Sequence, residues 1–141
     1  RDTLMLTEHV RAGLKRYVTH KYAGSANTLA VYLLDPEIED MVKNAIRHTE
    51  KGNYLALDPE VTQELIEAVG KEIASHPFPP GARPPVILTI AEIRRYFRKI
   101  IEAEFPQLSV LSYQELSENL RIQPIARVTI APEILQKVQA A

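Results

Sequence analysis

Three short apolar runs in the sequence each lead directly into a helix-start signal. They are LAVYLL (Leu29–Leu34), PVILT (Pro85–Thr89) and SVL (Ser109–Leu111). A compact apolar run of this length suits a strand that is buried on both faces. Strands that alternate with helices are typical of an α/β layer with a mainly parallel sheet. The sequence therefore predicts an α/β fold.

A fourth strand is expected near the C-terminal end of the chain. RIQPIARVTI (Arg121–Ile130) alternates as a strand does. Pro124 places this strand at a sheet edge or at a bulge, because proline donates no ladder hydrogen bond. For Ala131–Ala141 two alternatives stay open, a final helical turn or two, or a frayed tail. We expect a small, mainly parallel four-stranded sheet with flanking helices.

The N-terminal region predicts a helix that precedes this sheet. From Thr7 to Tyr22, apolar residues recur at a spacing that marks one helix face. AGSANT (Ala23–Thr28) is small and polar, which favours a linker. The chain starts on Arg1 rather than methionine and enters the helical pattern at once. We therefore expect a fragment of a longer protein whose first helix belongs to an upstream helical subdomain.

Two Asp-Pro pairs mark further helix starts. Asp35 and Asp58 each precede a proline. The aspartate can accept from unpaired N–H groups at the helix start, and proline has the φ that the first helical position needs. The first of these helices is predicted to run from Asp35 to Thr49, which would put His48 in its last turn. The five prolines of His76–Pro85 predict a stiff surface loop.

A hydroxyl residue followed three positions later by glutamate occurs after two of the strands. Thr89–Glu92 and Ser112–Glu115 both have the form of a capping box, in which hydroxyl and carboxylate each satisfy an N–H at the helix start. Ser112 has an alternative interpretation as a hydrolase nucleophile. That role needs a base and a G-x-S-x-G turn, and the serine stands in Leu111-Ser112-Tyr113 instead. We interpret Ser112 as a cap and expect no enzyme.

Composition narrows the kinds of site that the chain can carry. The absence of cysteine excludes disulfides, thiolate metal sites and cysteine nucleophiles. A net charge of −1 gives no overall attraction to nucleic acid or to an anionic membrane. No apolar run approaches the roughly 20 residues that span a bilayer, and the N-terminus lacks a signal-peptide pattern.

Residue spacing gives no metal or cofactor motif. The four histidines, His9, His20, His48 and His76, lack HExxH spacing, and the five glycines are isolated rather than grouped in a phosphate loop. We therefore expect no catalytic residue, no cofactor and no metal. The residues indicate a binding or scaffold module.

One cluster of basic residues is a candidate partner-binding site. Arg94, Arg95, Arg98 and Lys99 lie close together on one predicted helix. A solvated helix face, a contact with an acidic protein partner and a nucleic-acid contact are the three interpretations. The aromatic residues between them, Tyr96 and Phe97, belong to the apolar stripe of the helix, so no stacking platform for single strands accompanies the patch.

Three longer stretches carry a family resemblance. They are RDTLMLTEHVRAGLKRYVTHKYA, LLDPEIEDMVKNAI and PPVILTIAEIRRYFRKIIEAEFPQLSVLSYQELSENLRIQPIARV, of which FPQLSVLSYQELSENLRIQPIARV is the most specific part. On these residues the chain resembles the C-terminal end of the export-gate proteins of type III secretion, the FHIPEP family. That family includes flagellar biosynthesis protein A and the low-calcium-response and invasion proteins of injectisomes, and the likeness is closer to the injectisome branch. The resemblance leaves out Ala131–Ala141.

The resemblance implies a place in a larger assembly. Family members have an N-terminal transmembrane half and a cytoplasmic half of four subdomains, which forms a nonameric ring at the cytoplasmic face of the bacterial inner membrane. The ring receives chaperone–substrate complexes and the gatekeeper protein, helps order their export and is not known to catalyse a reaction. On this basis we expect residues 1–28 to end the helical third subdomain and form a linker. Residues 29–130 would form the α/β fourth subdomain, and 131–141 a C-terminal tail. The resemblance implies protein partners and other copies of the chain, no nucleic acid, and membrane contact only through missing N-terminal spans.

Overall fold

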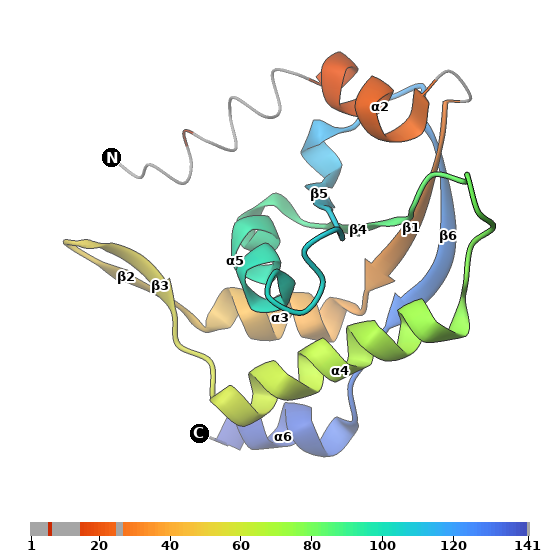
Figure 1. Ribbon diagram of the computed structural model, residues 1–141. Coiled ribbons are helices and arrows are strands. Elements are labelled where there is room, and N and C mark those ends of the chain that lie inside the picture. The colour runs from red at the N-terminus through yellow and green to blue at the C-terminus, as the bar shows by residue number, and fades with distance from the viewer. Residues whose placement is uncertain (1–5, 7–14, 25–26, 141) are drawn as a thin grey trace.

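A four-stranded parallel sheet organises the molecule. The computed structural model describes residues 6, 15–24 and 27–140 (Figure 1). The strands are β1 (Thr28–Leu34), β4 (Val86–Thr89), β5 (Val110–Ser112) and β6 (Arg121–Val128). Their order across the sheet is β5-β4-β1-β6, and every neighbouring pair is parallel. The predicted α/β fold with a small four-stranded parallel sheet is confirmed.

Pro124 occupies the kind of position that the sequence predicted. Strand β6 is an edge strand, and its pairing with β1 shifts register where Val31 pairs with Pro124 and Tyr32 with Ala126. Ile125 is thus the additional residue of a bulge. Both consequences expected of a proline in a strand, an edge and a bulge, occur together here.

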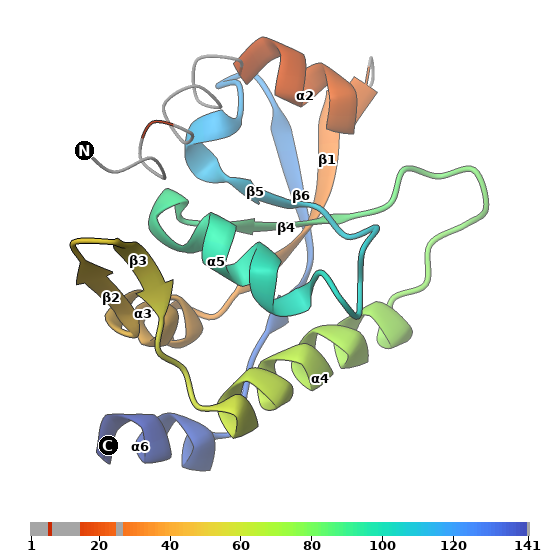
Figure 2. The same cartoon turned by 60° about the vertical axis from the view of Figure 1, so that its left-hand side comes forward.

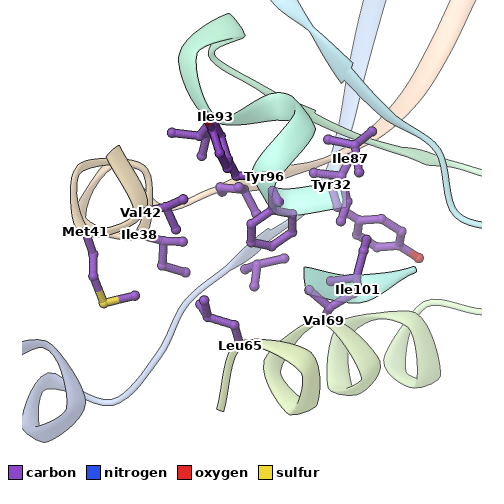
Figure 3. Packing of buried hydrophobic residues seen from close by; sticks show 14 of the residues in the cluster. Tyr32, Ile38, Met41, Val42, Leu65, Val69, Ile87, Ile93, Tyr96 and Ile101 are labelled. Carbon is purple, nitrogen blue, oxygen red and sulfur yellow. The ribbon is translucent and has the colours of Figure 1, made fainter. Parts of the chain in front are cut away.

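Helices cover one face of the sheet and form the larger core. They are α3 (Pro36–Asn44), α4 (Pro59–Ser75) and α5 (Ala91–Ile101). Tyr32 of β1 and Ile87 of β4 enter this core together with Phe97 of α5 and Leu65 of α4. Figure 3 shows most of these side chains converging between the helices and the sheet.

The second face of the sheet is also buried. Val31 and Leu88 point away from the larger core, as successive residues of a strand must, and join a second cluster. Helix α2 (Lys15–Ala23) contributes Val18 and Ala23 to that cluster. Burial on both faces explains why the strands read as continuous apolar runs.

Helix α3 is shorter than predicted. It ends at Asn44, and a two-stranded antiparallel hairpin follows, made of β2 (Ile46–Thr49) and β3 (Gly52–Leu55). The expected helix to Thr49, with His48 in its last turn, is therefore wrong. Ile46 continues the helical stripe of α3 in sequence, yet in the structure it pairs with Leu55 across the hairpin. Figures 1 and 2 show the hairpin extending away from the sheet.

Of the side-chain caps predicted for α3, α4 and α5, one is confirmed and two are wrong. Asp58 accepts from the N–H of Glu60 at 2.9 Å, as predicted. Asp35 stands at the start of α3 but makes no side-chain cap bond, so its predicted role is wrong. The Thr89–Glu92 capping box is wrong as well, because α5 begins one residue later than that motif requires, with Ile90 at the N-cap position.

Glutamate from another helix replaces the expected local cap of α5. Glu39 of α3 accepts from Thr89 Oγ1 at 2.7 Å and from the Ile90 N–H at 3.2 Å. The C-terminal tail is ordered as α6 (Pro132–Ala140), which decides between the helical and the frayed alternative. Within the described residues, no helix is long and apolar enough to cross a membrane.

Candidate functional site

Arg94 points into the protein rather than out of the predicted basic patch. Its side chain is buried, and its guanidinium donates to the Val110 carbonyl at 3.4 Å. The Arg94 Nε lies 4.0 Å from Oε1 of Glu115, whose side chain is fully buried. Arg94 therefore connects α5 to the first residue of β5 and to Glu115, three residues beyond its end.

Arg98 is also used within the fold. Its guanidinium donates to the carbonyls of Phe105, Leu108 and Pro106 at 3.3, 3.3 and 3.1 Å. These three carbonyls belong to the turn between α5 and β5. Because arginine presents several donors in one plane, a single side chain can hold the whole turn.

Arg95 and Lys99 are the exposed members of the patch. They are four residues apart and share the outer face of α5. The structure thus does not bring the four predicted residues together on one surface. A helix turns about 100° per residue, which sets Arg95 and Lys99 opposite the apolar stripe and Arg94 beside it. That signal was present in the sequence and separates the two kinds of basic residue.

Ser112 and Glu115 form the predicted cap. The backbone N–H of Ser112 donates to Glu115 Oε1 at 2.8 Å, and the Ser112 hydroxyl lies 3.2 Å from the same oxygen. The helix that they start is a single 3₁₀ turn, η2 (Tyr113–Glu115). The Ser112 side chain is fully buried, so its hydroxyl does not reach a surface where a substrate could bind.

The carboxyl ends of the strands are occupied by protein groups. Ligands of open α/β sheets commonly bind at this edge. Here the Glu39 carboxylate takes the donors of Thr89 and Ile90, and Tyr113 stands near it. Burial raises the pKa of the Tyr113 phenol, and the negative charge of Glu39 adds to that rise while Arg127 opposes it.

Three of the four histidines lie in the described part of the chain. His20 is exposed in the last turn of α2, and His48 Nδ1 lies 3.0 Å from Asn53 Oδ1 across the hairpin. His76 lies beside Glu72 at the end of α4. His9 falls outside the described residues. Among residues 6, 15–24 and 27–140, no group of three or more His, Asp or Glu side chains could hold a metal ion.

Sequence reasoning missed a groove beside α6. Its volume is about 500 Å³, and it lies between α3, the base of the hairpin, the start of α4 and α6. The apolar lining is Met41, Ala45, Ala56, Leu57, Val61, Leu135 and Val138. The polar lining is Glu37, Asp40, Asn44, Arg47, Asp58 and Lys137. We call this the α6 groove. No local motif indicates it, because its walls come from three separate stretches of the chain, residues 37–47, 56–61 and 135–138.

One ion pair joins α6 to α4 at the edge of the α6 groove. Lys137 Nζ lies 2.7 Å from Glu60 Oε1, and both side chains are exposed. The hydrogen bond to Glu60 raises the pKa of the Lys137 ammonium above its ordinary value. Helix α6 is thus joined to α4 by a charge contact, while its apolar residues pack against the larger core.

Comparison with known proteins gives consistent matches over most of the chain. The model of the FHIPEP family matches residues 1–121. The low calcium response locus protein D of Yersinia pestis is 44% identical over 130 residues, which are 92% of this chain and 18% of that protein. This chain thus spans less than a fifth of that relative's length.

Two solved structures show the same fold. The CdsV chain in the Chlamydia pneumoniae CdsV and CdsO complex is 47% identical with a TM-score of 0.82, over 91% of this chain and 37% of that chain. The nonameric SctV-C of EPEC is 35% identical with a TM-score of 0.78, over 91% of this chain and 37% of that chain.

Proposed function

The chain belongs to the FHIPEP family, the export-gate proteins of type III secretion, and from that premise we propose that it is a ring-forming, protein-binding module of an export gate. The observation that carries this proposal is the likeness to CdsV, at 47% identity over 91% of the chain. The module acts by presenting folded surfaces to other proteins.

Ring formation is the first part of the proposal. The nonameric SctV-C of EPEC supports it, since nine copies of a similar domain assemble there. A closed ring of nine uses two different surfaces on each copy, because head-to-tail contacts do not pair a patch with itself. We propose that the longer protein containing this chain forms such a ring at the cytoplasmic face of a bacterial inner membrane.

Export-apparatus proteins are the proposed partners. The CdsV and CdsO complex supports a partner of the CdsO kind. Chaperone–substrate complexes and a gatekeeper protein are the further partners that the family resemblance suggests. They would dock on the assembled cytoplasmic half, of which this chain is one part.

We propose subdomain bounds that follow the resemblance. Residues 1–28 end a helical third subdomain, 29–130 form the α/β fourth subdomain and 131–141 form a tail. Helix α2 nevertheless packs on the sheet, where the Ser117 N–H donates to Thr19 Oγ1 at 3.0 Å. Arg83 Nη1 donates to the Lys21 carbonyl at 3.1 Å, which adds a second contact. The last helix of the third subdomain would therefore move together with the fourth.

Arg95 and Lys99 are the proposed contact residues of α5 for an acidic protein surface. The guanidinium groups of Arg94 and Arg98 are instead bonded to carbonyls of the same chain and hold α5 to the residues that follow it. Pull-down and binding assays should use the cytoplasmic half that contains this chain, against the counterpart of CdsO, type III chaperones and gatekeepers. Replacing both residues with glutamate should weaken one of these contacts about tenfold, since two exposed ion pairs are lost.

A matched control is the pair Lys51→Glu and Lys71→Glu, an equal charge change at two exposed positions outside α5. It should leave the same contact unchanged. Unaltered binding of the Arg95→Glu, Lys99→Glu variant to every partner would remove these residues from the proposal. Absence of binding by the unaltered cytoplasmic half to all partners, together with failure to form rings, would overturn the proposed function itself.

Nucleic-acid binding is the alternative from another class. It would use the same patch, yet only Arg95 and Lys99 of the four residues are exposed. A net charge of −1 adds no general attraction. A nucleic-acid site predicts affinity that falls steeply with salt. A flat titration with single- and double-stranded DNA and RNA at low salt would exclude it.

A further inference from the structure

Helix α6 depends on its docking surface. It has nine residues, and helices shorter than about 12 residues are marginal on their own in water. Ile134, Leu135 and Val138 are half-buried against the larger core, and Lys137 is bound to Glu60. Figures 1 and 2 both show α6 beside the first turns of α4, outside the layer of helices that covers the sheet. Half-buried apolar side chains and an exposed ion pair are therefore among the contacts that hold α6 in place.

Helix α6 leaves part of its docking surface unfilled. The α6 groove keeps a volume of about 500 Å³ next to Leu135 and Val138. Met41, Leu57 and Val61 form an apolar lining that larger side chains could contact. Met41 and Val61 are already buried with α6 in place, whereas Ala56 and Leu57 keep exposed surface. A helix with bulkier apolar residues at the same positions would therefore bury more of Ala56 and Leu57.

The charges around the α6 groove favour a basic ligand. Glu37, Asp40 and Asp58 line it, and Glu60 stands at its edge as the partner of Lys137. Lys137 is the only basic residue in α6. Arg47 is a basic group of the groove lining, and it donates to the Asn44 carbonyl at 2.9 Å. A helix that carries several lysines or arginines would complement the acidic groups better than α6 does.

We propose that the α6 groove is a docking site for a basic amphipathic helix of a partner protein, and that α6 holds the site until this helix displaces it. Helix α6 shows the pattern that the site accepts, apolar residues at positions 134, 135 and 138 with a lysine at 137. Recognition by one apolar helix face in a groove is a recurrent mode of protein association. The proposal goes beyond a role in secretion and does not depend on it.

A peptide displacement experiment tests the proposal on the full chain. The probe is an 18-residue helical peptide that repeats the α6 apolar spacing with leucines and carries lysines on the flank that meets the acidic groups. Binding should raise hydrogen exchange in residues 132–140 and lower it around Met41 and Val61. The same peptide with glutamates in place of its lysines should bind at least about fivefold more weakly, because attraction becomes repulsion.

Two variants of the chain separate displacement from binding elsewhere. Val138→Asp should loosen α6 and tighten peptide binding several-fold, whereas Gln136→Glu, at an exposed position of α6, should change it less than about twofold. Asp40→Lys, which changes the charge of the groove lining and leaves the Lys137–Glu60 pair in place, should weaken binding of the lysine peptide and strengthen binding of the glutamate peptide. Circular dichroism confirms that each variant is folded. Peptide binding that leaves exchange in 132–140 unchanged, or no binding at millimolar peptide, would overturn the proposal.

Discussion

Removal of the Glu115 carboxylate should destabilise the fold far more than its place in a short 3₁₀ turn suggests. Glu115 is fully buried, accepts from the Ser112 N–H at 2.8 Å and lies 4.0 Å from Arg94 Nε. Replacement by alanine takes away the acceptor and the negative charge together. Arg94 would then stay in a buried position with its opposing charge removed.

The expected magnitude follows from the burial of both charges. Removing one member of a buried ion pair typically costs about 3–5 kcal/mol. The 4.0 Å separation of Arg94 and Glu115 favours the lower end, so we expect about 3 kcal/mol for Glu115→Ala. Glu115→Gln keeps an acceptor for the Ser112 N–H and should cost about 1–2 kcal/mol. Ser112→Ala removes only a hydroxyl and should cost about 1 kcal/mol.

Urea unfolding followed by circular dichroism measures these free energies. Glu118→Ala, at an exposed position three residues further on, is the matched control and should stay within about 0.5 kcal/mol of the unaltered chain. Arg94→Met combined with Glu115→Ala should cost less than the sum of the two single changes, because neither charge is then left alone. A cost below about 1 kcal/mol for Glu115→Ala would refute the argument that these charges support each other.

Three further changes test other parts of the fold. Gly24→Ala should destabilise by about 1–2 kcal/mol, because Gly24 has φ +65° and a Cβ there would meet the Arg83 guanidinium. Thermal unfolding measures the effect. The control is Gly81→Ala, because Gly81 also has a positive φ, +86°, but has open space around it, so the difference between the two variants isolates the contact with Arg83. Leu65→Ala should cost about 2–5 kcal/mol in urea unfolding, since the Leu65 side chain is fully buried in the larger core, and a cost below 1 kcal/mol would contradict that packing. Lys137 has a raised pKa in the folded chain, so the stability it contributes is present below the ordinary lysine pKa of 10.5 and is lost as pH rises through the raised value. The difference in melting temperature between the unaltered chain and Lys137→Met should therefore shrink between pH 9 and strongly alkaline pH, and a difference that stays constant would contradict the role of the ion pair.

The sheet could be predicted because its signals are local. Leu29–Leu34 is apolar throughout because both faces of β1 are covered. Pro124 predicted an edge or a bulge because proline has no N–H to donate to a neighbouring strand. The hairpin was not predicted because Ile46 is compatible with both the helical and the strand spacing of apolar residues. It extends the helical stripe of α3 and also starts a strand whose partner, Leu55, is nine positions away.

The candidate site was predicted less well because it depends on contacts between distant segments. Thr89 looks like the start of a capping box, yet Glu39, fifty residues earlier, supplies the acceptor. Arg94 and Arg98 belong to a run of basic residues, which predicted an exposed patch. In the structure they donate to carbonyls of the following turn and strand, and these acceptors could not be read from the run itself. The α6 groove has walls from segments far apart in sequence, so no short motif could indicate it.

The pairing of β1 with β6 has a consequence for the order in which the chain can fold during synthesis. Residue 28 lies beside residue 121 and residue 34 beside residue 128. A ribosome therefore releases the central strand long before it releases the strand that completes one of its edges. The edge of β1 that pairs with β6 therefore stays open until residues 121–128 have emerged, which exposes its backbone groups to other chains and makes closure of the sheet depend on long-range pairing.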